Sequence, residues 1–284
     1  MQKIRNFLDL RYWLHAVLAP ISDISGSDPQ AYGLTAQTIS IPTGQGLGLF
    51  AWFVPSFNLK PLLPVRPAVV LLHGWGGNAS NLLPAAQALH TAGYAVLLLE
   101  SRNHGRSAID DHSSLPRFAQ DLDCALDWLR LQKGIDPQRI IALGHSVGGA
   151  AVLLCASRRA DLWAAISVAA FAHPEQLMQR WFNSRWVPYW PLGWLVNRYL
   201  EHVIGARFDD IAPVNTLAKT NCPILLVHGL QDKTIPIDDA RRIFQNRKQC
   251  NVTLMECGGT HEEFDDPALV TSSIISFLAA SNHA

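Results

Sequence analysis

The amino-acid sequence predicts an α/β fold built on a doubly wound, mostly parallel β-sheet. Two observations carry this prediction: short apolar runs recur along the chain, and segments of helical length separate them. The runs are continuously apolar instead of alternating with polar residues, which is typical of strands buried on both faces of a parallel sheet. The chain has 284 residues, 49% of them hydrophobic, which suffices for one large core.

The chain begins with residues 1–34, which we expect to be a helical extension of the core. Read as a helix, this start places apolar side chains on one face, and we expect that face to pack on the domain. A helix lying on a membrane surface is the alternative. Asp9 and Arg11 interrupt the apolar residues, so the start is predicted to be neither a secretory signal nor a membrane span. Five cysteines without paired or metal-ligand spacing predict reduced thiols and a cytoplasmic protein.

Residues 35–171 and 222–284 are expected to form the sheet and its helices. The first two apolar runs, near residues 38–42 and 46–54, predict a hairpin. Six further runs predict strands at residues 68–74, 94–101, 139–146, 163–171, 222–229 and 251–257. The clearest helix is predicted within residues 115–132, where Phe118, Leu122 and Leu129 recur at helical spacing while aspartates face away. Residues 172–221 contain no strand-like run and are interpreted as an insertion above the sheet, between the sixth and seventh strands.

Several predicted strands end in residues that can carry chemistry. A glycine-rich turn, "HGWGGN", follows the third run, and Ser146, Asp232 and His261 follow the fifth, seventh and eighth. In open α/β sheets, ligands bind beyond the carboxyl ends of the strands. We therefore expect these three side chains and the glycine-rich turn to converge at one edge of the sheet.

The serine lies in Gly144-His145-Ser146-Val147-Gly148, which fits the G-x-S-x-G pattern of a nucleophile elbow. The motif alone is a weak signal, because a glycine-bearing turn can contain a serine by chance. Its position between an apolar strand and an alanine-rich helix strengthens it. The glycines are expected for steric reasons, and the positive end of the following helix favours negative charge at the site.

A serine hydroxyl needs a base to accept its proton, and that base needs an acid to orient it. His261, in a glycine-containing loop, is the predicted base, and Asp232 is the predicted acid. Asp238 and Asp239 are alternative acids, although both fall where a helix should begin and where acidic residues complement its dipole. Activity is then expected to rise with pH as the base loses its proton.

These motifs, together with "SRNHGRS" and "DPQRII", resemble α/β-hydrolases of the serine esterase and lipase type from about residue 36 to the C-terminus. The resemblance implies the α/β-hydrolase fold, an acyl-enzyme on Ser146, and an oxyanion hole made by the backbone N–H groups of Val147 and Trp75. It implies no metal and no organic cofactor. The family often has an aspartate where this chain has Glu100, for which we expect a structural role.

The sequence thus predicts a serine hydrolase that cleaves carboxylic esters with short to medium acyl chains. Residues 172–221 are expected to act as a lid whose aromatic residues meet the acyl group; a small core beneath the insertion is the alternative. The lid residues in question are Trp181, Trp186, Trp190 and Trp194. The Trp75 ring is expected to form a wall of the acyl pocket. A regular helix through the last three lid tryptophans is disfavoured by Pro188 and Pro191.

Other functions remain open at this stage. The same three residues serve thioesterases, amidases and peptidases, and a non-catalytic hydrolase-like binding protein is a rival of another class. Lysine plus arginine and aspartate plus glutamate number 23 each, and this balance gives no electrostatic reason to expect nucleic-acid binding. A small-molecule ester is the expected partner. His73, His145 and His228 are interpreted as structural histidines.

Overall fold

The computed structural model describes residues 18, 20, 22–56, 65–186, 188–248 and 251–281. Most of the predicted N-terminal helix, and with it the question of membrane contact, lies outside these residues. A short helical turn, η1 (Pro29–Tyr32), precedes the sheet. None of the helices in the described ranges combines the length and the apolar character that crossing a membrane requires.

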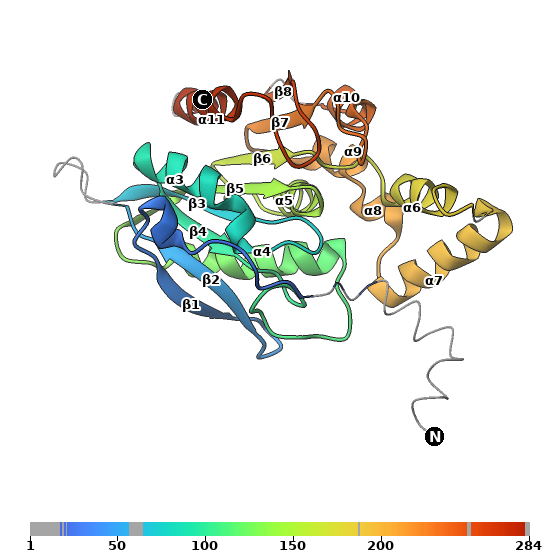
Figure 1. Ribbon diagram of the computed structural model, residues 1–284, viewed down its shortest axis with the longest axis horizontal. Helices are drawn as coiled ribbons and strands as arrows, with labels where there is room; N and C mark the ends of the chain where they lie inside the picture. The colour runs from blue at the N-terminus through green and yellow to red at the C-terminus, as the bar shows by residue number, and fades with distance from the viewer. Residues whose placement is uncertain are drawn as a thin grey trace.

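All eight predicted strands are present and form one sheet in the order β1-β2-β4-β3-β5-β6-β7-β8 (Figure 1). Strand β2 is antiparallel to β1 and β4, and the other neighbouring pairs are parallel. The prediction of a doubly wound, mostly parallel sheet is therefore confirmed. The strands are β1 (Gln37–Pro42), β2 (Gly48–Val54), β3 (Arg66–Leu72), β4 (Ala95–Leu99), β5 (Ile135–His145), β6 (Ala164–Val168), β7 (Ile224–Gly229) and β8 (Val252–Cys257).

Helices cover both faces of this sheet. On one face lie α3 (Leu83–Thr91), preceded by the turn η2 (Ala79–Leu82), and α11 (Pro267–Ala280). On the other face lie α4 (Leu115–Arg130), α5 (Val147–Ala156) and α10 (Ile237–Gln245). The two faces explain why the strand sequences are continuously apolar. In β3, Val70 and Leu72 pack towards α4 and α5, whereas Val69 and Leu71 pack towards α3 and α11.

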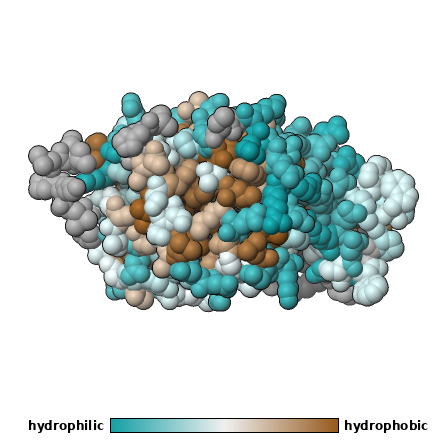
Figure 2. All heavy atoms as spheres, turned by 90° about the horizontal axis from the view of Figure 1, so that it is seen from above, coloured by the Kyte–Doolittle hydropathy of each residue, from teal (hydrophilic) through white to brown (hydrophobic). Residues whose placement is uncertain are grey.

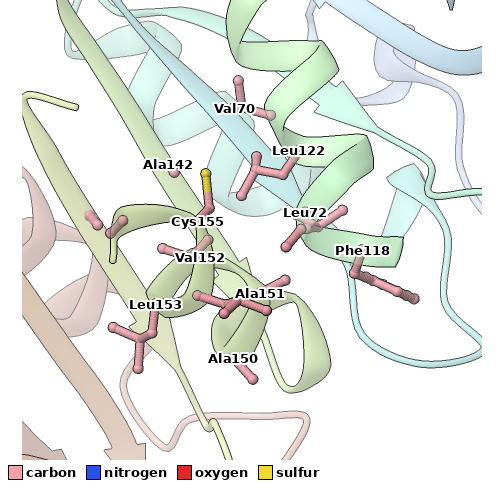
Figure 3. Close-up of a cluster of buried hydrophobic side chains, with 14 of the residues drawn as sticks. Val70, Leu72, Phe118, Leu122, Ala142, Ala150, Ala151, Val152, Leu153 and Cys155 are labelled. Atoms are coloured by element: carbon pink, nitrogen blue, oxygen red, sulfur yellow. The ribbon is translucent and has the colours of Figure 1, made fainter. Parts of the chain in front are cut away.

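Helix α4 forms as its amphipathic pattern predicts. The Ser114 hydroxyl accepts a hydrogen bond from the Arg117 N–H and caps its first turn. Its apolar face, which includes Phe118 and Leu122, meets β3 and α5 (Figure 3). Burying one such side chain fully stabilises the fold by about 1.5–3 kcal/mol.

Residues 172–221 connect β6 to β7 and consist of two parts. The outer part contains α6 (Pro174–Asn183), η3 (Tyr189–Gly193) and α7 (Trp194–Ile204); it protrudes from the molecule (Figure 1), and we call it the outer hairpin. A regular helix does not run through this stretch, because it is interrupted at η3, which follows Pro188 and contains Pro191, as predicted. The inner part contains α8 (Phe208–Ile211), α9 (Pro213–Thr216) and η4 (Leu217–Lys219), and it packs against α5. Buried Phe208, Ile211 and Leu217 make this inner part a portion of the core.

Candidate active site

Ser146 lies in a sharp turn between β5 and α5. Its φ and ψ angles are 56° and −119°, a conformation that a non-glycine residue adopts only when its surroundings impose it. The neighbouring glycines impose it by close packing. A Cβ atom at Gly144 would lie 2.3 Å from the Gly148 carbonyl, and one at Gly148 would lie 2.4 Å from the Leu72 oxygen. The G-x-S-x-G sequence is therefore a steric requirement of this turn.

The three predicted residues lie together at the carboxyl edge of the sheet. The Ser146 Oγ atom lies 3.0 Å from Nε2 of His261, and Nδ1 of the same imidazole lies 2.7 Å from Oδ2 of Asp232. An ionised carboxylate can accept hydrogen bonds but cannot donate them, so Nδ1 of His261 carries a proton and donates a hydrogen bond to Asp232. The lone pair of Nε2 therefore faces the serine hydroxyl. This is the orientation in which the imidazole can accept the serine proton.

Asp232 is buried and held by several donors. Its Oδ1 accepts hydrogen bonds from the N–H groups of Thr234 and Ile235, at 2.9 and 2.7 Å, and His228 Nε2 lies 3.3 Å from its Oδ2. Burial alone would raise the pKa of Asp232, but the hydrogen bonds from His228, His261 and Ile235 outweigh it and hold the pKa well below its usual range. The carboxylate is therefore ionised at any pH near neutrality.

The alternative acids are engaged elsewhere. Asp238 is exposed and pairs with Arg241. Asp239 is almost fully buried; it forms an ion pair with Arg180 of the outer hairpin and accepts a hydrogen bond from the Ala172 N–H. The helix-dipole interpretation of Asp239 was therefore incomplete, since this side chain fastens the outer hairpin to the core. No local sequence pattern indicates this pair, because its members are 59 residues apart.

Two of the histidines interpreted as structural contact the predicted acid and base, His228 touching Asp232 and His145 touching His261. His228 touches Asp232, as described above, and also hydrogen bonds to the Ile235 carbonyl, 2.8 Å away. His145 Nε2 lies 2.8 Å from the carbonyl oxygen of His261. Burial lowers the pKa of His145, so its neutral ring donates Nε2–H to that oxygen. In the sequence, these contacts of His145 and His228 were indicated only by the position of each histidine beside a glycine or serine at a strand end.

His73 is structural, as interpreted. Its Nδ1 lies 2.7 Å from the Gly74 oxygen, and its Nε2 lies 3.1 Å from the Ser101 nitrogen, from which it accepts a hydrogen bond. Burial and the nearby His104 ring lower the pKa of His73 to about 3, so the ring is neutral. The buried Glu100 has the structural role expected of it, because its carboxylate accepts hydrogen bonds from the backbone N–H groups of Ala79 and Arg106.

The predicted oxyanion-hole residues flank the serine. Val147 is the first residue of α5, and the turn that carries Trp75 passes so close that a Cβ at Gly74 would lie 3.2 Å from Ser146 Cβ. The Trp75 ring stacks against Phe118 with a centroid separation of 6.2 Å and lines the cavity at the serine. Its position agrees with the expected role as a wall.

An apolar cavity of about 1200 Å³ contains Ser146 and His261. Small-molecule sites usually measure about 300–1,000 Å³, so this one has room for a sizeable ligand. Among the described residues, no group of three or more histidine, cysteine, aspartate or glutamate side chains could hold a metal ion.

The prediction that four tryptophans line this cavity is wrong for three of them. Trp181 lines it, but Trp186, Trp190 and Trp194 do not. Trp186 and Trp190 are 95% and 70% exposed, because the proline-containing turn η3 carries this stretch to the outer end of the hairpin. The cavity-facing residues of α6 and α7 were missed, although they recur at helical spacing. They are Leu177, Met178, Leu200 and Ile204.

Comparisons with known proteins agree with this architecture. The family model described as "Serine aminopeptidase, S33" matches residues 64–205, half of the chain. An uncharacterized Escherichia coli protein, YfhR, is 25% identical over 250 residues, covering 87% of this chain and 80% of that protein. The esterase Pf2001 of Pyrococcus furiosus has a similar fold, with a TM-score of 0.74 at 18% identity, over 93% of this chain and 97% of that one.

A puromycin-hydrolyzing peptidase of Mycobacterium tuberculosis also has a similar fold, with a TM-score of 0.69 at 19% identity. The similarity covers 88% of this chain and 40% of the peptidase. An esterase and a peptidase therefore share this fold, and the fold alone does not select between their reactions. The chain belongs to the serine aminopeptidase S33 family of α/β-hydrolases.

Proposed function

We propose that this chain is a serine hydrolase that cleaves carboxylic esters through an acyl-enzyme on Ser146. The observation that carries the proposal is the continuous hydrogen-bonded series from Ser146 through His261 to Asp232 inside an apolar cavity. Uncharged esters suit such a cavity because they bring apolar surface and no charge that would have to be desolvated.

In the proposed reaction, Ser146 Oγ attacks the ester carbonyl while His261 Nε2 accepts its proton. The N–H groups of Val147 and Trp75 would donate to the oxyanion that develops on the carbonyl oxygen. His261 then gives its proton to the leaving alcohol, and water releases the acid by the same steps. Asp232 remains ionised throughout and stabilises the imidazolium that forms between these transfers.

The expected acyl groups are short to medium chains, although the cavity volume leaves room for longer ones. Aminopeptidase activity is a second candidate. Glu262 and Glu263, which follow His261, line the cavity and could pair with the ammonium group of a peptide N-terminus. Hydrolysis of an amino-acid p-nitroanilide in preference to p-nitrophenyl butyrate would favour this second candidate.

We also propose a cytoplasmic location. The four described cysteines are free, and burial raises the pKa of Cys222 to about 12, which leaves its thiol unreactive. Unpaired, buried thiols suit a reducing compartment. Secretion of the mature protein in cell fractionation would contradict this location.

The test of the proposed function is Ser146→Ala, assayed with p-nitrophenyl butyrate. We expect hydrolysis and labelling by a fluorophosphonate probe to be lost while the circular dichroism spectrum is unchanged. Ser157→Ala, at the far end of α5, is the matched control and should leave activity intact. Retained turnover by Ser146→Ala would exclude Ser146 as the nucleophile.

The pH profile gives a second test. The depressed pKa of Asp232 means that its ionised form stabilises the fold above the unfolded value of about 3.9, and that this contribution is lost only as pH falls through the lower folded value. Asp232 therefore does not titrate between about pH 5 and 8. Activity requires a neutral base, so we expect kcat/KM to be lost under acidic conditions that protonate the imidazole. Activity that does not depend on pH down to the onset of acid unfolding would count against the imidazole as base.

A further inference from the structure

The turn that carries Trp75 is fixed at its start, where His73 accepts a hydrogen bond from the Ser101 N–H. The two residues that follow Trp75 are Gly76 and Gly77, and Gly76 has a φ angle of 73°. Glycine restricts the backbone less than any other residue does. The direction in which the Trp75 N–H points therefore depends on how the far end of the turn is held.

The apolar surroundings of the turn do not fix this direction by themselves. The turn lines the apolar cavity together with residues of α3 and α11. Figure 2 shows apolar residues gathered near the middle of the face that carries these helices. Hydrophobic contacts are non-directional, whereas a hydrogen bond constrains both a distance and an angle. Directional contacts are therefore needed to hold a backbone N–H in place.

Asn78 ends the turn, and all polar groups of its side chain are bonded. Its Oδ1 accepts a hydrogen bond from the Ser80 N–H, at 2.8 Å, and thereby caps η2. Its Nδ2 donates to the carbonyl oxygens of Asp23 and Ser25, at 3.0 and 2.9 Å. Asn78 is 3% exposed, although both of these partners are exposed. The far end of the turn is thus bound to a segment that lies 53 to 55 positions earlier in the chain.

That segment is residues 22–28, which we call the N-terminal strap. In Figure 1 it is the dark-blue stretch that leads into η1. The Ser22 hydroxyl donates a hydrogen bond to the Gly105 oxygen, 2.6 Å away. Gly26 passes so close to η2 that a Cβ atom there would lie 2.6 Å from Ser80 Cβ. The strap therefore contacts both the end of the turn and the loop that contains Gly105.

The buried Glu100 joins these two places from the inside. Its carboxylate accepts hydrogen bonds from the N–H groups of Ala79, next to Asn78, and of Arg106, next to Gly105. The strap, the end of the turn, Glu100 and the Gly105 loop thus form a closed series of contacts. In a closed series, no member can shift without straining its neighbours, and the end of the turn is held accordingly.

We propose that Asn78 and the N-terminal strap are positioning elements of the oxyanion hole, which hold the turn so that the Trp75 N–H points at the carbonyl oxygen of the substrate. The inference rests on the proposed function. A donor accelerates acyl transfer only where it meets the developing oxyanion, and a displacement of about 1 Å can cost about 10²-fold in rate. The charge on that oxygen is largest in the transition state, so loosening the turn should lower kcat more than it raises KM.

Asn78→Asp tests the link to the strap while it keeps the cap of η2. An aspartate still accepts the Ser80 N–H and is a favourable N-cap residue. Its second oxygen, however, faces the carbonyl oxygens of Asp23 and Ser25 and cannot donate to them. Asn78→Ser also keeps a capping oxygen but is too short to reach the strap, and it serves as the uncharged second variant.

Gly26→Ala loosens the strap from its own side, because the added Cβ meets Ser80 and the φ angle of Gly26 is 121°. Asn246→Asp is the matched control. The Asn246 amide donates to a backbone oxygen in the same way, at 2.9 Å from the Arg242 carbonyl, but at the exposed end of α10.

The measurements are kcat and KM for p-nitrophenyl butyrate and the rate of labelling by a fluorophosphonate probe, whose phosphoryl oxygen must enter the same pair of N–H groups. We expect Asn78→Asp, Asn78→Ser and Gly26→Ala to lower kcat and the labelling rate by about tenfold to hundredfold, with KM within about twofold. Asn246→Asp should match the wild type. The double variant Asn78→Asp/Gly26→Ala should be no slower than the slower single variant, because both changes release the same strap.

A lower melting temperature with unchanged kcat and labelling would show that Asn78 only stabilises the fold, and would overturn the inference. Multiplied losses in the double variant would overturn the role of the strap. A wild type that is labelled but hydrolyses no ester would contradict the proposed ester hydrolysis, while the labelling rates would still test the positioning of the turn. A wild type that is neither labelled nor active would overturn both proposals.

Discussion

The edge of the sheet that carries Ser146 and the outer hairpin above it are held in different ways. At the edge, backbone N–H groups, His145 and His228 fasten His261 and Asp232 to their loops. The outer hairpin is joined to α10 by polar contacts of α6, including Arg180 with Asp239 and Gln176 with Arg242. Its far end exposes large indole rings. From this contrast we propose that the edge carries the chemistry and that the hairpin influences which substrates reach it.

The largest effect is expected for Asp232→Asn. The amide would leave His261 in the wrong tautomer, and kcat on every ester, including ethyl acetate, should fall about 10⁴-fold. Asp238→Asn, which changes an exposed carboxylate near the same strand end, should keep wild-type activity. A loss smaller than about tenfold for Asp232→Asn, measured by initial rates, would show that Asp232 is not the acid that orients His261.

His145→Leu should have the next largest effect, because it removes the hydrogen bond to the His261 carbonyl. We expect kcat to fall about 10²-fold at nearly unchanged KM, since small displacements of a catalytic group cost about that much. His145→Gln supplies an amide N–H near the same place and should restore most of the rate. An equal loss in both variants would show that the imidazole contributes packing alone.

Arg180→Met tests the attachment of the hairpin. It leaves the buried Asp239 carboxylate with the Ala172 N–H but without its guanidinium partner, which is costly for a buried charge. We expect KM for ethyl octanoate to rise about threefold to tenfold and kcat for ethyl acetate to stay near wild type. The double variant Arg180→Met/Asp239→Asn removes the charge and should recover part of the affinity. A uniform loss of kcat on both esters would contradict the proposal that the hairpin affects substrate binding and the edge affects the chemistry.

The smallest effect is expected at the far end of the hairpin. Trp186→Ser together with Trp190→Ser should change kcat/KM for dissolved esters less than about twofold, because both rings are exposed and outside the cavity. Trp181→Ala, on the cavity wall, should lower kcat/KM for ethyl octanoate by about tenfold. Equal effects of the two variants would restore the original prediction for these tryptophans.

The sequence was sufficient to predict the sheet because strands buried on both faces have continuous apolar runs that local reading can detect. That Ser146, Asp232 and His261 lie together could be predicted for a related reason: each lies shortly after the end of such a run, and parallel strands bring their carboxyl ends to one edge. The tryptophans of the hairpin were misplaced because their direction depends on how a proline-containing turn closes. The Arg180–Asp239 pair depends on helix packing between segments distant in the chain, which one-dimensional patterns do not encode.

The division of residues 172–221 into an outer and an inner part bears on how this scaffold could be re-engineered. The inner part belongs to the core beside α5, so its removal would open the domain. The outer hairpin, by contrast, leaves and rejoins that core as a discrete module. Hairpins exchanged from other proteins at the boundaries of α6 and α7 should therefore transplant ligand preference while the catalytic framework is inherited intact.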